Sequence, residues 1–227
     1  MTEAADPTDP GRRWDLSGRR LYLCTPDRPD LGPFVEACII GGVDVVQLRD
    51  KQLADSELVA RARIVQQACA RYQVPFILND RPDLAAAIGA DGVHVGQDDI
   101  PPAEARRLIG EPALLGLSTH APSELRGAVE HRLPVDYLSA GPVVATPTKP
   151  GRPGTGLGYI REAVSASPWP VWITGGVDPE TVGEMIAVGA RHFVVVRWLT
   201  EAPDPGLHAR RLRDAIDTGI ARAESGP

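Results

Sequence analysis

The sequence has little cysteine and no long apolar run. Its three cysteines, Cys24, Cys38 and Cys69, are odd in number and lack metal-ligand spacing, which argues against a disulfide framework or a zinc site. We expect them to be small buried residues in a reducing compartment. No stretch is apolar enough to span a bilayer or to form a secretory signal. The sequence therefore predicts a cytoplasmic protein without a membrane partner.

An excess of positive charge is also missing. The formal net charge is -6 and the isoelectric point is about 5.4, which argues against a broad nucleic-acid surface, because such surfaces need clustered basic residues. A small basic pocket for a phosphorylated ligand remains compatible with this charge. The 227 residues, 43% hydrophobic and 24% charged, suit one globular domain or one α/β barrel.

Short strand-like runs alternate along the chain with segments of helical spacing. We predict helices at residues 55–72, 122–131, 179–188 and 207–223. The predicted strands are Arg20–Cys24, Val43–Arg49, Pro75–Asn79, Gly92–Val95, Leu114–Ser118, Tyr137–Ser139, Val171–Thr174 and Phe193–Val196.

This alternation implies parallel strands joined by right-handed crossovers. Eight such units predict an α/β fold of the (β/α)8 TIM-barrel class with a single domain. An open doubly wound sheet is the alternative, although no G-x-G-x-x-G motif follows the first strand. We expect a flexible N-terminal tail at residues 1–18, the barrel at 19–223 and a C-terminal tail at 224–227.

Polar residues gather at the carboxyl ends of several predicted strands, where a purely structural barrel would place Val, Ile and Leu. Arg49 and Lys51 follow the second strand, and Lys149 lies in a loop rich in Pro and Gly at residues 141–158. Each alone suits solvated surface charge. Three cations predicted on one barrel face favour a phosphate site instead.

Acidic residues and glycines complete the predicted site. Asp80 ends the third strand and Asp99 follows the fourth. Carboxylates beside phosphate-binding cations suggest Mg²⁺, although helix capping explains them equally well, and Asp99 two residues before Pro101 suits a cap. Gly175 and Gly176 follow the seventh strand, where barrels often bind phosphate through backbone N–H groups. A tight turn is the plainer interpretation, and both can hold.

These motifs, in this order, resemble those of the thiamine phosphate synthase family, and the resemblance runs from about Leu21 to Thr200. The landmarks are Gln47-Leu48-Arg49-Asp50-Lys51, Asn79-Asp80, Asp91-Gly92-Val93-His94-Val95-Gly96-Gln97-Asp98-Asp99, Gly116-Leu117-Ser118-Thr119-His120, Thr146-Pro147-Thr148-Lys149 and Gly175-Gly176. Asp50 stands where the family commonly has Glu, and Arg197 where it often has a small hydroxyl residue. The second departure leaves the role of the Arg197 side chain open.

The resemblance implies the substrates 4-amino-2-methyl-5-pyrimidinylmethyl diphosphate and 4-methyl-5-(2-phosphoethyl)thiazole, and one Mg²⁺ per subunit held by Asp80 and Asp99. It assigns catalysis to Arg49, Lys51, Ser118 and Lys149. The pyrimidine diphosphate would be bound by Gln47, Leu48, Arg49, Asp50, Lys51, Asn79, Ser118 and Lys149. The thiazole phosphate would be bound by Thr146, Pro147, Thr148, Gly175, Gly176, Val196 and Arg197.

The resemblance also implies a reaction in which diphosphate leaves first and the thiazole nitrogen then captures the pyrimidinylmethyl cation. We expect the loop at residues 143–158 to exclude water as a lid carrying Lys149. A thiazole tautomerase on the same fold, another phosphate-binding barrel enzyme and a non-catalytic barrel that binds thiamine phosphates are the alternatives. We expect small-molecule substrates as partners, no nucleic acid, and a homodimer.

Overall fold

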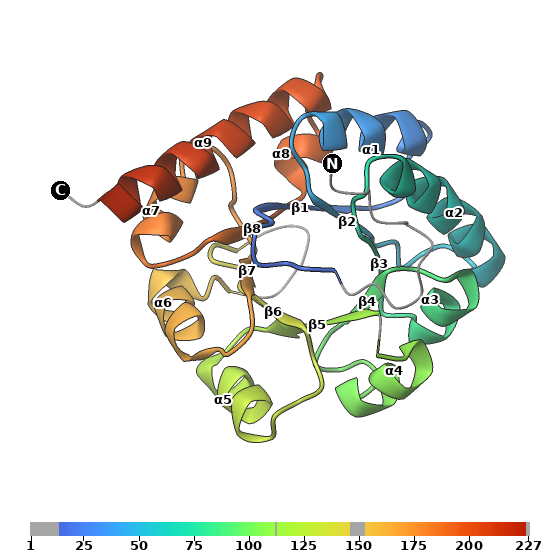
Figure 1. Cartoon of the computed structure of the whole chain (residues 1–227), viewed down its shortest axis with the longest axis horizontal. Coiled ribbons are helices and arrows are strands. Elements are labelled where there is room, and N and C mark those ends of the chain that lie inside the picture. The colour runs from blue at the N-terminus through green and yellow to red at the C-terminus, as the bar shows by residue number, and fades with distance from the viewer. Residues whose placement is uncertain (1–13, 112, 146–152, 226–227) are drawn as a thin grey trace, which may run out of the picture.

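The computed structural model describes residues 14–111, 113–145 and 153–225. Eight parallel strands form a closed barrel inside a ring of helices (Figure 1). The strands are β1 (Leu21–Thr25), β2 (Val45–Leu48), β3 (Phe76–Asn79), β4 (Gly92–Val95), β5 (Leu114–Thr119), β6 (Tyr137–Ala140), β7 (Val171–Ile173) and β8 (His192–Val195). The predicted barrel is thus confirmed, and the open sheet is excluded.

Pairing between the first and last strands closes the sheet. Leu21 of β1 is in register with Phe193 of β8, while Tyr22 of β1 pairs with Val45 of β2. Each of the eight predicted strands occurs close to its expected position, with ends that differ by at most two residues. For example, β2 covers Val45–Leu48 within the predicted run from Val43 to Arg49.

Helices surround the barrel because their apolar stripes pack on the outer face of the sheet. α2 buries Leu58, Ala62, Val65, Ala68 and Cys69 along one face. The helices are α1 (Leu31–Ile40), α2 (Asp55–Arg71), α3 (Pro82–Ile88), α4 (Pro102–Ile109), α5 (Pro122–Glu130), α6 (Gly156–Ala166), α7 (Val182–Ala187), α8 (Arg197–Thr200) and α9 (Pro205–Ser225). Within the described ranges, no helix combines the length and apolar character needed to cross a bilayer.

The predicted helix boundaries differ most from the structure in α7 and α9. α7 begins at Val182 rather than at Pro179, because the Asp178 carboxylate accepts the backbone N–H groups of Glu180 and Thr181 in a turn before the helix. α9 continues to Ser225, so the described part of the expected C-terminal tail is helical.

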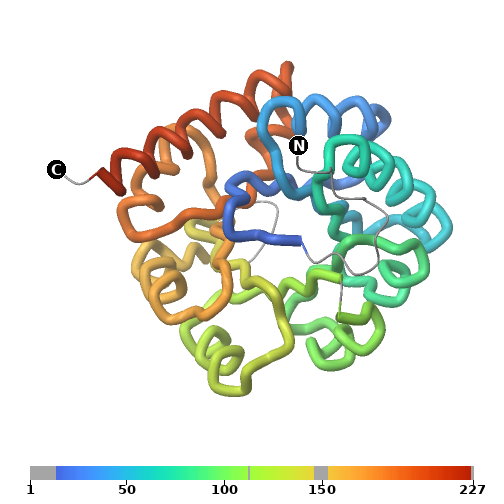
Figure 2. The backbone as a smooth tube through the Cα atoms, in the orientation of Figure 1, coloured from blue at the N-terminus to red at the C-terminus, as the bar shows by residue number. Residues whose placement is uncertain are grey.

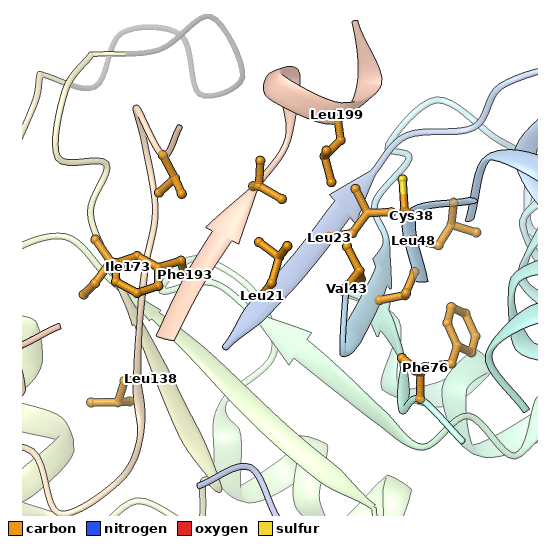
Figure 3. Close-up of a cluster of buried hydrophobic side chains, with 14 of the residues drawn as sticks. Leu21, Leu23, Cys38, Val43, Leu48, Phe76, Leu138, Ile173, Phe193 and Leu199 are labelled. Atoms are coloured by element: carbon orange, nitrogen blue, oxygen red, sulfur yellow. The ribbon is translucent and has the colours of Figure 1, made fainter. Parts of the chain in front are cut away.

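The main hydrophobic core lies between the sheet and the helices. Leu21, Leu23 and Phe193 point from the strands into this layer, and Cys38 of α1 joins them (Figure 3). Leu48 is fully buried in the same layer. This position corrects the expectation that Leu48 contacts substrate, because its side chain faces the helices.

A second apolar cluster fills the barrel interior at its amino end. It corrects the predicted tail at residues 14–18, while residues 1–13 lie outside the described residues. Trp14 and Leu16 are 9% and 5% exposed, and Trp14 Nε1 donates to Asp91 Oδ1 at 2.8 Å. The first described residues therefore cross the middle of the barrel instead of hanging free (Figure 2). Their partners inside the barrel are Tyr22, Val45, Ile77, Leu114, Tyr137, Trp172 and Val194.

Candidate active site

A cavity of about 660 Å³ lies at the carboxyl ends of the strands. This is the face where such barrels place their active sites, and the size suits small-molecule ligands. The cavity brings together most of the predicted site residues, which come from strand ends and loops far apart in the sequence. Those that line it are Gln47, Arg49, Lys51, Asn79, Asp80, Asp99, Ser118, Gly175, Gly176, Val196 and Arg197.

Asp50, like Leu48, does not line the cavity. The Asp50 carboxylate accepts the backbone N–H groups of Asp27, Gln52 and Leu53, so it shapes the loop between β2 and α2. The structure therefore corrects its assignment as a substrate ligand. The predicted residues Thr146, Pro147, Thr148 and Lys149 lie outside the described residues, as does the middle of the expected lid.

Lys51, Asp80 and Asp99 form a compact charged cluster at one side of the cavity. Lys51 Nζ lies 2.7 Å from Asp80 Oδ2, and the carboxyl groups of Asp80 and Asp99 are hydrogen-bonded to each other. Backbone geometry positions both acids. Asp80 has a left-handed φ of 59° and donates its N–H to the carbonyl of His94, while Asp99 Oδ2 accepts the N–H of Gly96 at 2.7 Å.

The two carboxyl groups have opposite pKa shifts. Burial raises the pKa of Asp80, and the nearby Asp99 adds to this effect against the opposing Lys51. Burial also opposes ionisation of Asp99, but the hydrogen bonds from Asp80 and from the Gly96 N–H hold its pKa below the usual value. The two carboxyl groups therefore influence each other's ionisation, since the negative charge of one disfavours a second charge beside it.

A hard divalent cation fits this pair. Mg²⁺ takes oxygen ligands and uses one or two carboxylates together with substrate phosphates and water. Among the residues that the structure describes, no group of three or more His, Cys, Asp or Glu could hold a metal. A metal at Asp80 and Asp99 would thus need oxygen atoms from a ligand, which suits a phosphorylated substrate.

Neutral hydrogen-bonding groups form the floor of the cavity. Gln47 donates from Nε2 to the phenol of Tyr22 at 2.9 Å and accepts at Oε1 from the thiol of Cys24 at 3.1 Å. Ser118 Oγ lies 2.9 Å from His94 Nε2. These side chains are buried, so the groups that meet a ligand here are held in place before it binds.

Sequence reasoning missed part of this floor. Tyr22 and Cys24 of β1 and Ser139 of β6 line the cavity, although we assigned them no role. Strand alternation could have found them, because Tyr22 and Cys24 both flank outward-facing Leu23. His94 and His208 also line the cavity.

The side of the cavity opposite the charged cluster is glycine-rich. Gly175 and Gly176 follow β7 with left-handed φ values of 86° and 77°. A Cβ atom at Gly175 would lie 2.4 Å from Pro142 Cβ, and one at Gly176 would lie 2.6 Å from Val144 Cγ2. Glycine is therefore required at both positions. The exposed backbone N–H groups of such a turn can approach a phosphate closely.

Comparison with known proteins agrees with this arrangement. A family model described as thiamine monophosphate synthase matches residues 21–199. The thiamine-phosphate synthase of Thermobifida fusca is 44% identical over 210 residues, covering 91% of this chain and 96% of the relative. That of Thermus thermophilus is 46% identical over 205 residues, covering 87% and 97%.

A solved structure has the same fold over most of its length. The thiamine phosphate pyrophosphorylase of Pyrococcus furiosus superposes with a TM-score of 0.80 at 27% sequence identity, covering 88% of this chain and 96% of that one. The matched region includes every described residue of the cavity up to Trp198. With the barrel, the charged cluster and the glycine-rich turn in place, the chain belongs to the thiamine monophosphate synthase family.

Proposed function

We propose that the chain joins 4-amino-2-methyl-5-pyrimidinylmethyl diphosphate to 4-methyl-5-(2-phosphoethyl)thiazole, giving thiamine phosphate and diphosphate. Membership of the family makes it a transferase. The observation that supports the proposal is a cavity with a charged side and a glycine-rich side, each suited to a phosphate group. Lys51, Asp80 and Asp99 come from the β2–β4 side, while Gly175 and Gly176 come from β7, across the closed barrel.

The charged side suits the diphosphate of the pyrimidine substrate. Asp80 and Asp99 would hold Mg²⁺, which when bound neutralises charge on a leaving diphosphate. Lys51 and Arg49 add fixed positive charge beside it. Lys149, outside the described residues, keeps its predicted place at the same diphosphate.

The reaction transfers a carbon from oxygen to nitrogen. The bond between the pyrimidinylmethyl carbon and the diphosphate oxygen breaks, and the electron pair leaves with diphosphate. The thiazole nitrogen then donates its lone pair to the resulting cation. The residues of the cavity need supply no nucleophile, so their role is electrostatic stabilisation and positioning. Gln47 and Ser118 would hold the pyrimidine ring, and Gly176 the thiazole phosphate.

A thiazole tautomerase on the same fold is the second candidate. Such an enzyme binds the thiazole phosphate alone. It would not need the charged cluster of Lys51, Asp80 and Asp99. The cluster is built from three separate loops, and this favours the synthase. A non-catalytic barrel that binds thiamine phosphates would have the cavity without turnover.

Product formation from the two purified substrates tests the proposal. We expect thiamine phosphate with Mg²⁺, none with excess chelator, and a strong loss in Asp80→Asn, which tolerates the left-handed backbone. Asp217→Asn is the matched control, because Asp217 lies on α9 away from the cavity. If the wild type makes no product either with Mg²⁺ or with excess chelator, the synthase proposal is wrong. Isomerisation of the thiazole phosphate alone then becomes the next assay.

We also propose that the protein works in the cytoplasm as a homodimer. Its three cysteines are buried thiols that form no disulfide, which suits a reducing compartment. Light scattering coupled to size-exclusion chromatography tests the dimer, and a mass near the 24.3 kDa of one chain would contradict it.

A further inference from the structure

A chain of hydrogen bonds runs through the barrel interior beneath the cavity. The phenol oxygens of Tyr22 and Tyr137 lie 3.0 Å apart, and Tyr137 Oη lies 3.2 Å from His94 Nδ1. Gln47 contacts this chain at Tyr22, and Ser118 contacts it at His94. It therefore joins the two floor groups to which we assign the pyrimidine ring, although they stand on different strands.

Counting hydrogens gives the chain a direction. Burial raises the pKa of Tyr22 and of Tyr137, so each phenol keeps one hydrogen to donate. Tyr22 already accepts the N–H of Gln47, so its hydrogen goes to Tyr137. Tyr137 then donates to His94 Nδ1, the imidazole carries its hydrogen on Nε2, and Ser118 Oγ accepts it.

With the Gln47 amide oriented so that Nε2 donates to Tyr22, the opposite direction leaves a hydrogen without a partner. If Tyr137 donated to Tyr22, the Tyr22 hydrogen would find no acceptor among the residues that the structure describes. A protonated His94 leads to the same result, because both ring nitrogens would then donate. A buried donor without an acceptor is destabilising, so the direction from Tyr22 to Ser118 is favoured.

The fold makes room for the central contact by leaving out a side chain. Gly116 stands on β5 between His94 of β4 and Tyr137 of β6, and pairs with both. A Cβ atom there would lie 2.1 Å from Tyr137 Cζ and 2.4 Å from His94 Nδ1. Any other residue at this position would separate the imidazole from the phenol. The contact is therefore a built feature of the barrel.

We propose that Tyr22 and Tyr137 are positioning residues that make the cavity select a 4-aminopyrimidine ring over its 4-oxo analogue. The inference rests on the proposed function and deepens it. The hydrogen-bond chain holds the Gln47 amide in one orientation and leaves the hydroxyl hydrogen of Ser118 available to donate to a ligand. An aminopyrimidine presents a ring nitrogen acceptor beside an amino donor, which one orientation of an amide matches.

The 4-oxo analogue presents the inverse pattern, a ring N–H donor beside a carbonyl acceptor. To match it, the Gln47 amide would have to turn over and place Oε1 against Tyr22 and Nε2 against Cys24. That change would reverse every hydrogen in the chain and leave Ser118 donating to His94 instead of to the ligand. The preference for the 4-amino ring and the direction of the buried hydrogen-bond chain therefore depend on each other.

The tautomer of His94 tests the direction without any turnover. In protein labelled with ¹⁵N-histidine, long-range proton–nitrogen correlation spectra identify which ring nitrogen carries the hydrogen. The signal of His94 is assigned as the one lost in His94→Gln, among the five histidines of the chain. We expect the hydrogen on Nε2 in the wild type. A hydrogen on Nδ1, or on both nitrogens, would overturn the inference.

Substrate discrimination tests the consequence. The ratio of kcat/KM for the 4-amino substrate to that for the 4-oxo analogue should fall on the order of tenfold or more in Tyr22→Phe and Tyr137→Phe. The KM for the thiazole phosphate should not change, since neither phenol lies on the glycine-rich side. Tyr159→Phe is the matched control, because Tyr159 is a buried tyrosine outside the cavity.

An unchanged ratio in either folded variant would sink the proposal, as would an equal fall in Tyr159→Phe. If the wild type forms no product, the proposed reaction fails but the selection can still be measured. Calorimetric affinities of the two pyrimidinylmethyl diphosphates, on the same variants, then replace kcat/KM and must show the same loss of preference.

Discussion

At the amino end of the barrel, three aspartates each stand one residue before a strand and accept hydrogen bonds from a neighbouring strand. Two also pair with an arginine, Asp44 with Arg213 and Asp136 with Arg106. The bonds run to Asp44 from the backbone N–H groups of Arg20 and Leu21, to Asp91 from that of Phe76 and from the Trp14 indole, and to Asp136 from that of Leu115.

At the carboxyl end, Asp80 and Asp99 are placed against each other, with one lysine beside them. One residue type therefore serves two purposes in one barrel. The amino-end carboxylates satisfy backbone donors and stabilise the fold. Burial and the nearby Asp99 disfavour ionisation of Asp80 at the carboxyl end, and in the proposed function a bound cation would offset this cost.

The contrast between the two ends predicts its largest effect for a substitution of Asp99, which should lower turnover. Asp99→Asn keeps an oxygen that can accept the Gly96 N–H but removes the charge that would hold the metal. Product formation should fall on the order of 10²–10³-fold, while the free energy of unfolding changes by less than about 0.5 kcal/mol. Steady-state assays and urea denaturation measure the two. Full activity with Mg²⁺ would remove Asp99 from the metal site.

The largest expected loss of stability is at Asp136. Asp136→Asn leaves the guanidinium of Arg106, whose side chain is 9% exposed, without its counter-charge. Breaking a buried pair at one partner costs about 3–5 kcal/mol. We expect a lower free energy of unfolding in urea, with turnover per folded molecule unchanged. Adding Arg106→Met should recover part of the loss, and a stable single variant would contradict the assignment.

A smaller loss of stability is expected at Trp14. Trp14→Phe keeps the ring in the amino-end cluster but removes the hydrogen bond to Asp91. Thermal and urea denaturation should show a loss of about 1 kcal/mol. Ser17→Ala serves as a comparison, because its side chain bonds only within the exposed start of the chain, at Asp15. Wild-type stability in Trp14→Phe would restore the interpretation of this segment as a free tail.

The smallest effect is a pH dependence from Asp44. Burial raises the pKa of Asp44 above its ordinary value of 3.8, against the backbone N–H groups and Arg213. With its folded-state pKa above the unfolded value, its contribution to stability is full below that ordinary value and is lost as pH rises through the raised pKa.

Asp44→Asn should therefore remove a small decline of unfolding free energy with rising pH. Urea denaturation across about pH 4 to 7 measures the slope, and the slope is compared instead of the absolute stability, because the substitution also weakens the contact with Arg213. Asp214→Asn, at an exposed position of α9, should keep the wild-type slope. An identical slope in Asp44→Asn would show that Asp44 ionises normally in the fold.

Much of the site could be predicted because its residues stand at strand ends. In a parallel barrel the carboxyl ends of all strands meet at one face. Arg49, Asn79 and Ser118 therefore converge even when the predicted strand limits are wrong by one or two residues. This holds for β2, whose predicted run was longer than the observed strand.

Side-chain direction was harder to predict, because it reverses with a shift of one residue. Leu48 adjoins two cavity residues in the sequence, yet it faces the helices. Asp50 lies between Arg49 and Lys51, yet it binds the backbone of its own loop. The phenol of Tyr137 reaches His94 only because Gly116 of the intervening strand has no side chain.

The sequence by itself determined the class of fold and the kind of chemistry. Alternating strand and helix periods leave few topologies, and cations, acids and glycines at strand ends suit two phosphate groups. Tertiary structure alone decided which groups share a hydrogen and which segment fills the amino end. Trp14 lies in a stretch without regular pattern, and its place depends on the space between eight strands. Such contacts join residues far apart in the chain, and local sequence holds no information on their distance.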